Sequence, residues 1–337
     1  MQPNLAAAIF GISGTELSGD EMDFFADVNP YGFILFQRNC ESPKQIQSLI
    51  DGLRDVTGRE RLPILIDQEG GRVARLKPPH WPVYPPAKKF ADMYAHYKQR
   101  ALRGAFLTAR LIAHDLYTLG ITVDCAPVAD LNVDGAHDVI GDRAYGKDAN
   151  QVAALAGATA KGLMEGGIVP VLKHIPGHGR ATADSHLELP CVDAKTELLR
   201  NTDFVPFKAL ANLPMAMTAH VLYSAFDDKC LATVSRTMID LIRREIGFNG
   251  LLMSDDLSMK AMQGDFTQRT RDTLNAGCDV VLHCNGNFDE MQAVAEGLSP
   301  LAGVPLTRAN LAMKSVGDPL PIDIKAARKE LEHLLGM

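Results

Sequence analysis

The sequence has no excess of basic residues, no long hydrophobic run and no basic N-terminal leader. Lysine and arginine together number 34 against 41 aspartates and glutamates, so the net charge is −7 with neutral histidines. This sign argues against nucleic acid or an anionic membrane surface as the main partner. No apolar stretch approaches the roughly 20 residues of a membrane span, and no Lys or Arg precedes the N-terminal apolar run as in a signal peptide. We therefore expect a cytoplasmic protein without nucleic-acid or membrane partners.

Cysteine pairs at redox or metal-binding spacing are also missing. The six cysteines include no Cys-x-x-Cys pair, and Cys125 and Cys278 lie in or beside apolar stretches. Reduced, mostly buried thiols in a reducing compartment are therefore expected. The sequence also lacks a P-loop, a Gly-x-Ser-x-Gly nucleophile motif and a basic stripe interleaved with aromatics.

What the chain does contain is a regular succession of short apolar runs. Hydrophobic residues make up 46% of the chain and charged residues 22%, which is ordinary for a folded domain. The runs are nearly continuous rather than alternating with polar residues, as is typical of parallel strands covered on both faces. We predict strands within 6–12, 32–36, 63–66, 121–128, 169–172, 215–218, 250–253 and 279–282.

Helical patterns lie between these runs, and those at about 97–119, 149–165 and 267–276 each end at a glycine before the next strand. One helix start is clearly marked. Ser42 supplies an N-cap, the following proline stands at the first helical position, and Gln45 is placed to complete a capping box.

Eight strands alternating with helices, without a linker-like tract, favour an α/β fold. We predict a single (β/α)8 TIM-type barrel domain over 1–337, with a doubly wound open sheet as the alternative. Three additions are expected: a proline-rich rim loop at 77–90 that carries the only tryptophan, a long loop at 177–194, and an outer C-terminal helix at 322–335.

The predicted strands end in unusually many polar residues. In a barrel of this kind the active site lies at the carboxyl ends of the strands. For any single charged residue there, an ordinary ion pair is the simpler interpretation. Several that converge on one rim instead favour a binding site. The residues are Asp67, Glu69, Arg72, Arg75, Asp130, Lys173, His174, His220, Asp255, Asp256 and His283.

The long loop at 177–194 contains Asp184 and His186, two residues apart. A local bend would let the carboxylate hydrogen-bond one imidazole nitrogen while the other faces the site. A neighbouring carboxylate favours the imidazolium, as a general acid/base near neutral pH requires. A pair that only stabilises the loop explains the spacing equally well.

A metal site in the same loop is the second interpretation. His174, His178, Asp184 and His186 have the composition of zinc ligands. However, the proline and glycines between the first two histidines exclude the helix that would make an i, i+4 pair converge. The first strand also offers none of the ligands that a barrel metallohydrolase usually places there, so we expect no metal.

Four motifs make the chain resemble a known family. They are LIDQEGGRVARL (65–76), IGDRAYG (140–146), KHIPGHGRATADSH (173–186) and LLMSDDLSM (251–259). Together they closely resemble the single-domain bacterial β-N-acetylglucosaminidases of glycoside hydrolase family three, along essentially the whole chain. The chain departs from many relatives at Ile175, Asp142 and Ala144, beside the functional positions, which bears on fine specificity rather than on the reaction.

The resemblance implies a role for individual residues. Asp255 corresponds to the nucleophile that forms a covalent glycosyl intermediate, His186 to the acid/base and Asp184 to its charge partner. Spacing alone does not choose Asp255 over Asp256, because adjacent strand residues point to opposite faces. Residues implied to hold the hydroxyls and acetamido group of the sugar are Asp67, Arg75, Arg143, Lys173 and His174.

The implied reaction is the retaining hydrolysis of terminal, non-reducing β-N-acetylglucosamine, without a cofactor. The implied substrates are small carbohydrates, namely N-acetylglucosaminyl-1,6-anhydro-N-acetylmuramyl fragments (muropeptides where they carry peptide) from cell-wall turnover. Two alternatives remain open: a metal-dependent hydrolase on the same barrel that uses the histidine-rich loop, and a catalytically inactive sugar-binding protein. The intact Asp255, Asp184 and His186 argue against the second.

Overall fold

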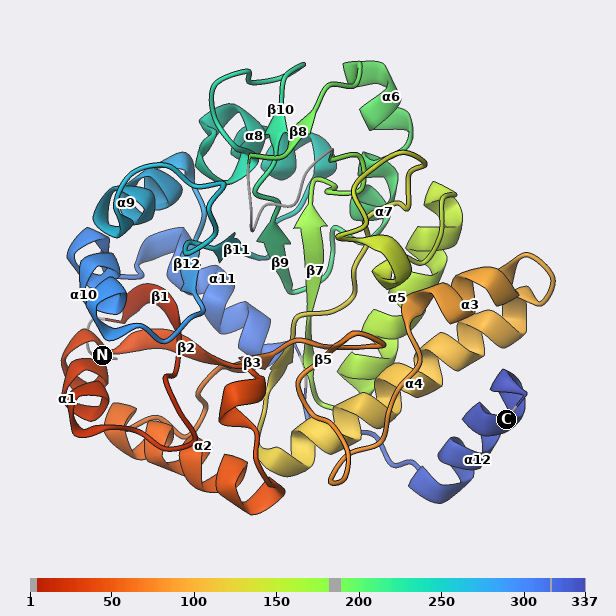
Figure 1. The fold of residues 1–337 in the computed structure, drawn as a ribbon, viewed down its shortest axis with the longest axis horizontal. Coiled ribbons are helices and arrows are strands. Elements are labelled where there is room, and N and C mark those ends of the chain that lie inside the picture. Colours follow the sequence, from red (N-terminus) through yellow and green to blue (C-terminus); the bar gives the residue numbers. More distant parts are fainter. Residues whose placement is uncertain (1–4, 182–188, 316, 337) are drawn as a thin grey trace.

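The central feature of the molecule is a closed barrel of parallel strands surrounded by helices (Figure 1). The computed structural model describes residues 5–181, 189–315 and 317–336. Around the barrel the strands follow the order β1-β12-β11-β9-β7-β6-β3-β2. The predicted (β/α)8 TIM-type barrel is therefore confirmed, and the open-sheet alternative is wrong. The strands are β1 (Ala6–Gly11), β2 (Pro30–Leu35), β3 (Ile64–Ile66), β6 (Val123–Asp124), β7 (Val169–Ile175), β9 (Met215–Thr218), β11 (Leu251–Asp256) and β12 (Val280–His283).

Both faces of the barrel strands are buried, which explains their continuous apolar composition. Along β1, Ala7 and Ile9 join one apolar cluster with residues of the other barrel strands. The intervening Ala8 and Phe10 belong to a second cluster, which Phe25 of the surrounding helix layer also joins. Alternate side chains of one strand thus fill the barrel interior and the layer between strands and helices.

Helices of unequal length form the outer layer. The longest, α4, lies beside α5 along one side of the barrel, and the C-terminal helix α12 packs on the outside of α4 (Figure 1). An ion pair between Arg103 of α4 and Glu330 of α12 joins this last pair. The helices are α1 (Gly19–Val28), α2 (Pro43–Thr57), α3 (Ala87–Tyr94), α4 (Lys98–Leu119), α5 (Ala149–Glu165), α6 (Thr196–Asn201), α7 (Phe204–Ala209), α8 (Arg236–Leu241), α9 (Phe266–Ala276), α10 (Phe288–Gly297), α11 (Gly303–Lys314) and α12 (Ile324–Leu335).

The start of α2 forms largely as its sequence predicts. Ser42 accepts a hydrogen bond from the Gln45 N–H at 3.3 Å, and Pro43 is the first helical residue. The prediction of a full capping box is wrong. Its second bond would run from the Ser42 N–H to the Gln45 side chain, but that side chain accepts from the Glu41 N–H at 3.0 Å instead. That bond still satisfies a backbone donor beside the helix terminus.

The predicted additions to the barrel differ in detail from the structure. The rim loop ends before residue 90, because α3 begins at Ala87, and Trp81 is only 8% exposed. Within the long loop at 177–194, Cys191 and Val192 form the short strand β8, which pairs with β10 (Leu222–Tyr223). A short antiparallel pair, β4 (Gln68–Gly70) and β5 (Val73–Ala74), follows β3 and was not predicted.

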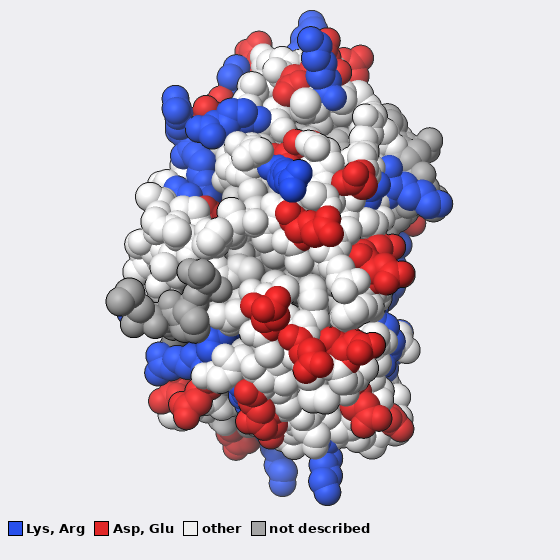
Figure 2. Space-filling model, turned by 90° about the vertical axis from the view of Figure 1, so that its left-hand side faces the viewer, with Lys and Arg blue, Asp and Glu red and all other residues white. Residues whose placement is uncertain are grey.

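The surface charge follows the acidic composition. Figure 2 shows acidic side chains spread across the face that carries α1, α9 and α10 in Figure 1. All six cysteines are free; Cys125 and Cys278 are buried as predicted, whereas Cys40, Cys191 and Cys230 are partly exposed. Among the described residues, no helix combines the length and apolar composition needed to cross a bilayer.

Candidate functional site

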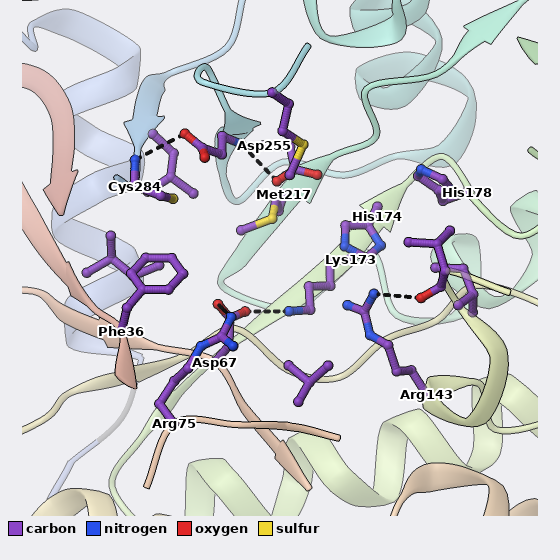
Figure 3. Close-up of a pocket in the computed structure, with 17 residues that line it drawn as sticks. Phe36, Asp67, Arg75, Arg143, Lys173, His174, His178, Met217, Asp255 and Cys284 are labelled. Atoms are coloured by element: carbon purple, nitrogen blue, oxygen red, sulfur yellow. Dashed lines mark hydrogen bonds and ion pairs between the residues drawn. The ribbon is translucent and has the colours of Figure 1, made fainter. Parts of the chain in front are cut away.

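A cavity of about 180 Å³ lies where the sequence predicts the site, at the carboxyl ends of the barrel strands (Figure 3). Its wall brings together six predicted residues from distant parts of the chain: Asp67, Arg75, Arg143, Lys173, His174 and Asp255. Asp184 and His186, the predicted acid/base pair, lie outside the described residues. The resemblance implied that one of these residues is the nucleophile and that the other five hold the sugar. The barrel places all six around one cavity.

Asp67 lies at the centre of an ion cluster on one side of the cavity. The Lys173 ammonium lies 2.7 Å from its Oδ1, and the Arg75 guanidinium lies 3.0 Å from its Oδ2. Burial would raise the pKa of Asp67, but the charges of Lys173 and Arg75 outweigh it and hold the pKa well below the ordinary value. The carboxylate is therefore ionised and fixed, with its oxygens turned toward two cations.

Glu69 extends this cluster; its place after a predicted strand marked it as one of the converging polar residues, but the family resemblance implied no role for it. Its carboxylate accepts two parallel bonds from Arg143, both 2.8 Å, and contacts the Lys173 ammonium at 2.7 Å. Burial opposes ionisation, yet Arg143 and Lys173 lower the pKa of Glu69 to about 2. The alternating spacing Asp67-x-Glu69 was the available signal, because residues two apart on an extended segment share a face.

The β4–β5 pair explains how Arg75 reaches Asp67. Between the two acids, the Gln68 side chain turns away and accepts hydrogen bonds from the N–H groups of Arg75 (2.9 Å) and Leu76 (3.0 Å). The Gln68 amide also donates to the Leu76 carbonyl oxygen at 3.2 Å. This short turn brings Arg75 back over the end of β3, where its guanidinium lies 4.9 Å from the Phe36 ring centre.

The low pKa of Glu69 predicts a specific pH dependence of stability. The folded pKa is about 2 against an ordinary 4.5, so the stabilisation is present above pH 4.5 and is lost as pH falls toward 2. Glu69→Gln lacks the ionised carboxylate and therefore this stabilisation. Its free energy of unfolding at pH 6 should be lower than that of the parent by on the order of 2 kcal/mol. We expect urea unfolding to show this gap narrowing between pH 6 and pH 2.5.

Glu330→Gln is the matched control for this experiment. Glu330 also pairs with an arginine, but its side chain is 41% exposed. Exposed pairs contribute less than about 1 kcal/mol, so this variant should follow the parent closely. A gap between Glu69→Gln and the parent that stays constant with pH would contradict the assigned charge state.

The carboxyl end of β11 presents two adjacent aspartates in different roles. Asp256 Oδ1 accepts the N–H groups of Ser258 and Cys284, each at 3.0 Å, and its Oδ2 accepts the Ser258 hydroxyl at 2.5 Å. Both residues line the cavity; Asp255 is 7% exposed, and its carboxylate accepts the Asp256 N–H at 2.8 Å. Asp256 thus shapes the turn after the strand, while Asp255 faces the ion cluster across the cavity (Figure 3).

Two strand-end histidines do not reach the cavity. His220 is completely buried and bonds the Thr233 hydroxyl at 2.7 Å and the Asp256 carbonyl oxygen at 3.0 Å. His283 pairs with Glu290 at 3.0 Å, away from the cavity. For these two residues the simpler interpretation of a structural side chain, rather than a site residue, is correct, although Nδ1 of His283 is buried without a hydrogen-bond partner among the described residues. Within 5–181, 189–315 and 317–336, no three histidine, cysteine or acidic side chains are placed to share a metal ion.

The remaining cavity wall is apolar and suits the carbon face of a ring-shaped ligand. It includes Phe36, Met217, Met259 and Leu282, and the Phe36 ring lies against the Arg75 guanidinium. Ionised donors and acceptors beside apolar side chains match a sugar, which carries hydroxyl groups around a hydrocarbon skeleton. A carboxylate on the wall, away from the cations, adds a group able to react rather than only bind.

Comparison with known proteins agrees with this arrangement. Residues 15–316 match the model of the family described as "Glycosyl hydrolase family 3 N terminal domain". A β-hexosaminidase of Methylobacillus flagellatus is 36% identical over 285 residues, covering 83% of this chain and 81% of the relative. A β-hexosaminidase of Alkalilimnicola ehrlichii is 38% identical over 286 residues, with the same coverage.

Solved structures extend the similarity over the full fold. NagZ from Neisseria gonorrhoeae in its native form superposes with a TM-score of 0.88 at 30% identity, covering 99% of both chains. The same protein in complex with N-trifluoroacetyl-D-glucosamine gives a TM-score of 0.89 with the same identity and coverage.

Proposed function

Because the chain belongs to glycosyl hydrolase family 3, we propose that it cleaves terminal, non-reducing β-N-acetylglucosamine with retention, through a covalent glycosyl intermediate on Asp255. The chain is a glycoside hydrolase, and the β-hexosaminidase names of its relatives support the choice of sugar. The observation that carries the proposal is the separation of roles around the cavity. The Asp255 carboxylate lies on one side, and the ionised cluster of Asp67, Arg75 and Lys173 lies on the other.

The binding side would hold the sugar through its hydroxyl and acetamido groups. Asp67 accepts hydrogen bonds, while Lys173, Arg75 and Arg143 donate them from positions fixed by the two buried carboxylates. His174 would add a ring nitrogen from the neighbouring wall. Because these groups are already ordered by one another, binding costs little further side-chain entropy, and the sugar would be oriented with its anomeric carbon toward Asp255.

The reaction would proceed in two displacements at the anomeric carbon. In the first, an Asp255 oxygen bonds to that carbon as the glycosidic bond breaks, and His186 gives its proton to the departing oxygen. In the second, His186 takes a proton from water, the water oxygen bonds to the carbon, and Asp255 is released. Two inversions give net retention. Asp184 would hold the imidazole and support its charge.

The starting point of the loop supports the role of His186. His178, near the root of the segment that carries Asp184 and His186, lines the cavity itself. Asp203 holds Arg180 at 2.7 Å, just beyond His178. His178 on the cavity wall precedes His186 by eight residues, and a segment of that length is long enough for the chain to return an imidazole to the sugar.

The proposed natural substrates are muropeptides with an N-acetylglucosaminyl-1,6-anhydro-N-acetylmuramyl core. A cavity of about 180 Å³ suits a single terminal sugar, with the rest of the substrate outside it. The complex of the gonococcal NagZ with N-trifluoroacetyl-D-glucosamine supports an N-acylated sugar as the ligand. A role in cell-wall recycling, and through it in cell shape and division, follows from this substrate. The free cysteines suit a cytoplasmic location.

A rate comparison tests the proposal. We expect an aryl β-N-acetylglucosaminide to be cleaved at least about tenfold faster than the matching aryl β-glucoside, since the acetamido contacts add a hydrogen bond or more of transition-state binding. Chelator should not change either rate. The purified disaccharide fragment should release N-acetylglucosamine as the β-anomer, detectable by NMR before mutarotation.

Other results would favour the alternatives. Loss of activity under chelator that is restored by metal would support the metal-dependent hydrolase. Binding of N-acetylglucosamine without turnover of any substrate would support the sugar-binding protein. Equal rates on glucoside and N-acetylglucosaminide would contradict the proposed specificity.

A further inference from the structure

Asp130 is a fully buried carboxylate directly behind the cavity wall, and the reaction described above does not use it. It lies beyond β6, where a bridge between Val128 and Lys173 continues the pairing of β6 with β7. The Ala129 N–H donates to the Lys173 carbonyl oxygen at 2.7 Å, which fixes the backbone before Asp130 against the end of β7. Its position is therefore set by the barrel itself.

Asp130 accepts hydrogen bonds from both histidines of this wall. Its Oδ2 lies 2.7 Å from Nδ1 of His174, and its Oδ1 accepts the backbone N–H of His178 at 2.6 Å. The backbone N–H of His174 lies 3.3 Å from both oxygens. The carboxylate accepts each of these backbone N–H bonds, as an anion requires, and the direction of the ring contact depends on the tautomer of His174.

The charge state of Asp130 follows from these neighbours. Burial alone would raise its pKa, but the His174 and His178 groups outweigh burial, and the pKa is lowered. At neutral pH the group is therefore a carboxylate and carries no proton to donate. The 2.7 Å contact with His174 requires that the proton lies on Nδ1 of the imidazole, leaving Nε2 for the other side of the ring.

The neighbouring His178 is held differently. Only its backbone reaches Asp130, and its ring centre lies 5.8 Å from that of His174. Burial and the proximity of His174 lower the pKa of His178 to about 4, so this ring is neutral at pH 7. Gly179 packs so closely on Leu131 that a Cβ there would lie 2.0 Å from the Leu131 carbonyl oxygen, which keeps the segment in place.

We propose that Asp130 is a positioning residue that fixes the orientation and the Nδ1–H tautomer of His174, so that Nε2 of His174 faces the bound sugar. The inference rests on the proposed function only in giving His174 a sugar contact. The same carboxylate ties the backbone of His178 to this wall, so one buried anion sets two neighbouring parts of the site. Asp130 acts through these residues and does not itself line the cavity.

Other charged and titratable groups also act on Asp130 and the two histidines. Asp255 lies within electrostatic range of His178, and the buried His220 within range of His174. Arg143 and the buried Tyr223 lie within electrostatic range of Asp130. None of these four is a hydrogen-bond partner of Nδ1 of His174 among the described contacts. Asp130 is the group in direct contact, so its removal should change the tautomer most.

The first test needs no change at Asp130. In protein labelled with ¹⁵N-histidine, the resonances of His174 are identified by their loss in His174→Gln. We expect Nδ1 of His174 to appear protonated throughout pH 6 to 9. An unprotonated Nδ1 in this range would overturn the proposal, whatever the enzyme cleaves, so this readout is independent of the proposed substrate.

The second test uses Asp130→Asn, which keeps the shape of the side chain. The amide oxygen should retain the short bond from the His178 N–H, which turns the amide NH2 toward Nδ1 of His174. Two donors cannot face each other, so His174 must move its proton to Nε2. We expect the tautomer change by NMR and a fall in kcat/KM of about 10- to 100-fold, the size of one hydrogen bond to a charged group.

A double-mutant comparison separates positioning from a general effect on the fold. In the His174→Gln background, Asp130→Asn should cost no more than about twofold, because the residue it acts through is gone. The same loss in both backgrounds would overturn the proposal. If Asp130→Asn does not fold, the spectrum of the parent protein still decides the question.

Asp279→Asn is the matched control. Asp279 is another buried carboxylate, held by Arg243 at 2.7 Å and Arg308 at 3.0 Å at the start of β12, the opposite end of the barrel from the cavity. Its replacement should lower stability while leaving the His174 tautomer and KM unchanged. A tautomer change in this control would show that the tautomer of His174 responds to any loosening of the barrel and is not set by Asp130.

Discussion

Replacing Asp255 by alanine is expected to lower kcat by at least about 10⁴-fold while the protein remains folded. The variant lacks the oxygen that bonds to the anomeric carbon, and no water can be activated in its place without a base on that side of the sugar. Steady-state rates on an aryl β-N-acetylglucosaminide, with circular dichroism to confirm the fold, measure the effect.

Asp256→Asn is the informative control for Asp255→Ala. The Asp256 carboxylate holds Ser258 and the Cys284 N–H, and an asparagine can keep one of those accepting positions. We expect a much smaller loss, of about tenfold, from a slightly displaced turn. If Asp256→Asn abolishes turnover and Asp255→Ala does not, the two aspartates have been assigned in the wrong order.

Replacing His186 by alanine is expected to give a loss that depends on the leaving group. General acid catalysis contributes about 10²- to 10⁴-fold, and a poor leaving group such as a sugar hydroxyl needs the proton most. An activated nitrophenolate departs without it, so its glycosylation step should be slowed little. The measurement is kcat/KM over a series of aryl glycosides, where the slope against leaving-group pKa should become steeper.

Asp184→Asn provides a graded comparison for His186→Ala. The imidazole remains, but its charge partner is neutral, so the same dependence on leaving group should appear with a smaller loss. A loss of equal size for all leaving groups in His186→Ala would contradict its role as the proton donor and would instead indicate a part in binding.

The sequence predicted the barrel well because its strands are buried on both faces. Continuous apolar runs such as 169–172 and 250–253 became β7 and β11, with each strand extending further into the polar residues that follow. The polar residues at the strand ends were also recognisable, because a charged side chain directly after an apolar strand is costly to bury unless it has a partner. Lys173 and Asp255 are therefore visible as candidates from the chain alone.

Local contacts explain most of the differences. The β4–β5 pair was missed because its strands are only three and two residues long and mix polar with apolar residues. The capping box of α2 formed only in part, since the Gln45 side chain found a partner at Glu41 and its amide reaches the Thr15 carbonyl oxygen. Such choices depend on atoms that periodicity does not describe.

The sequence by itself determined the number and chain order of the barrel strands, and the family motifs that carry the chemistry. Both are encoded in residues close together in the chain, through periodicity and spacing. Only the tertiary structure decided how these residues act on one another. Glu69 and Arg143 are 74 positions apart, and Asp130 and His174 are 44 apart. Barrel closure brings each pair within hydrogen-bond distance, and the neighbouring groups that it gathers outweigh burial and keep Glu69 and Asp130 ionised.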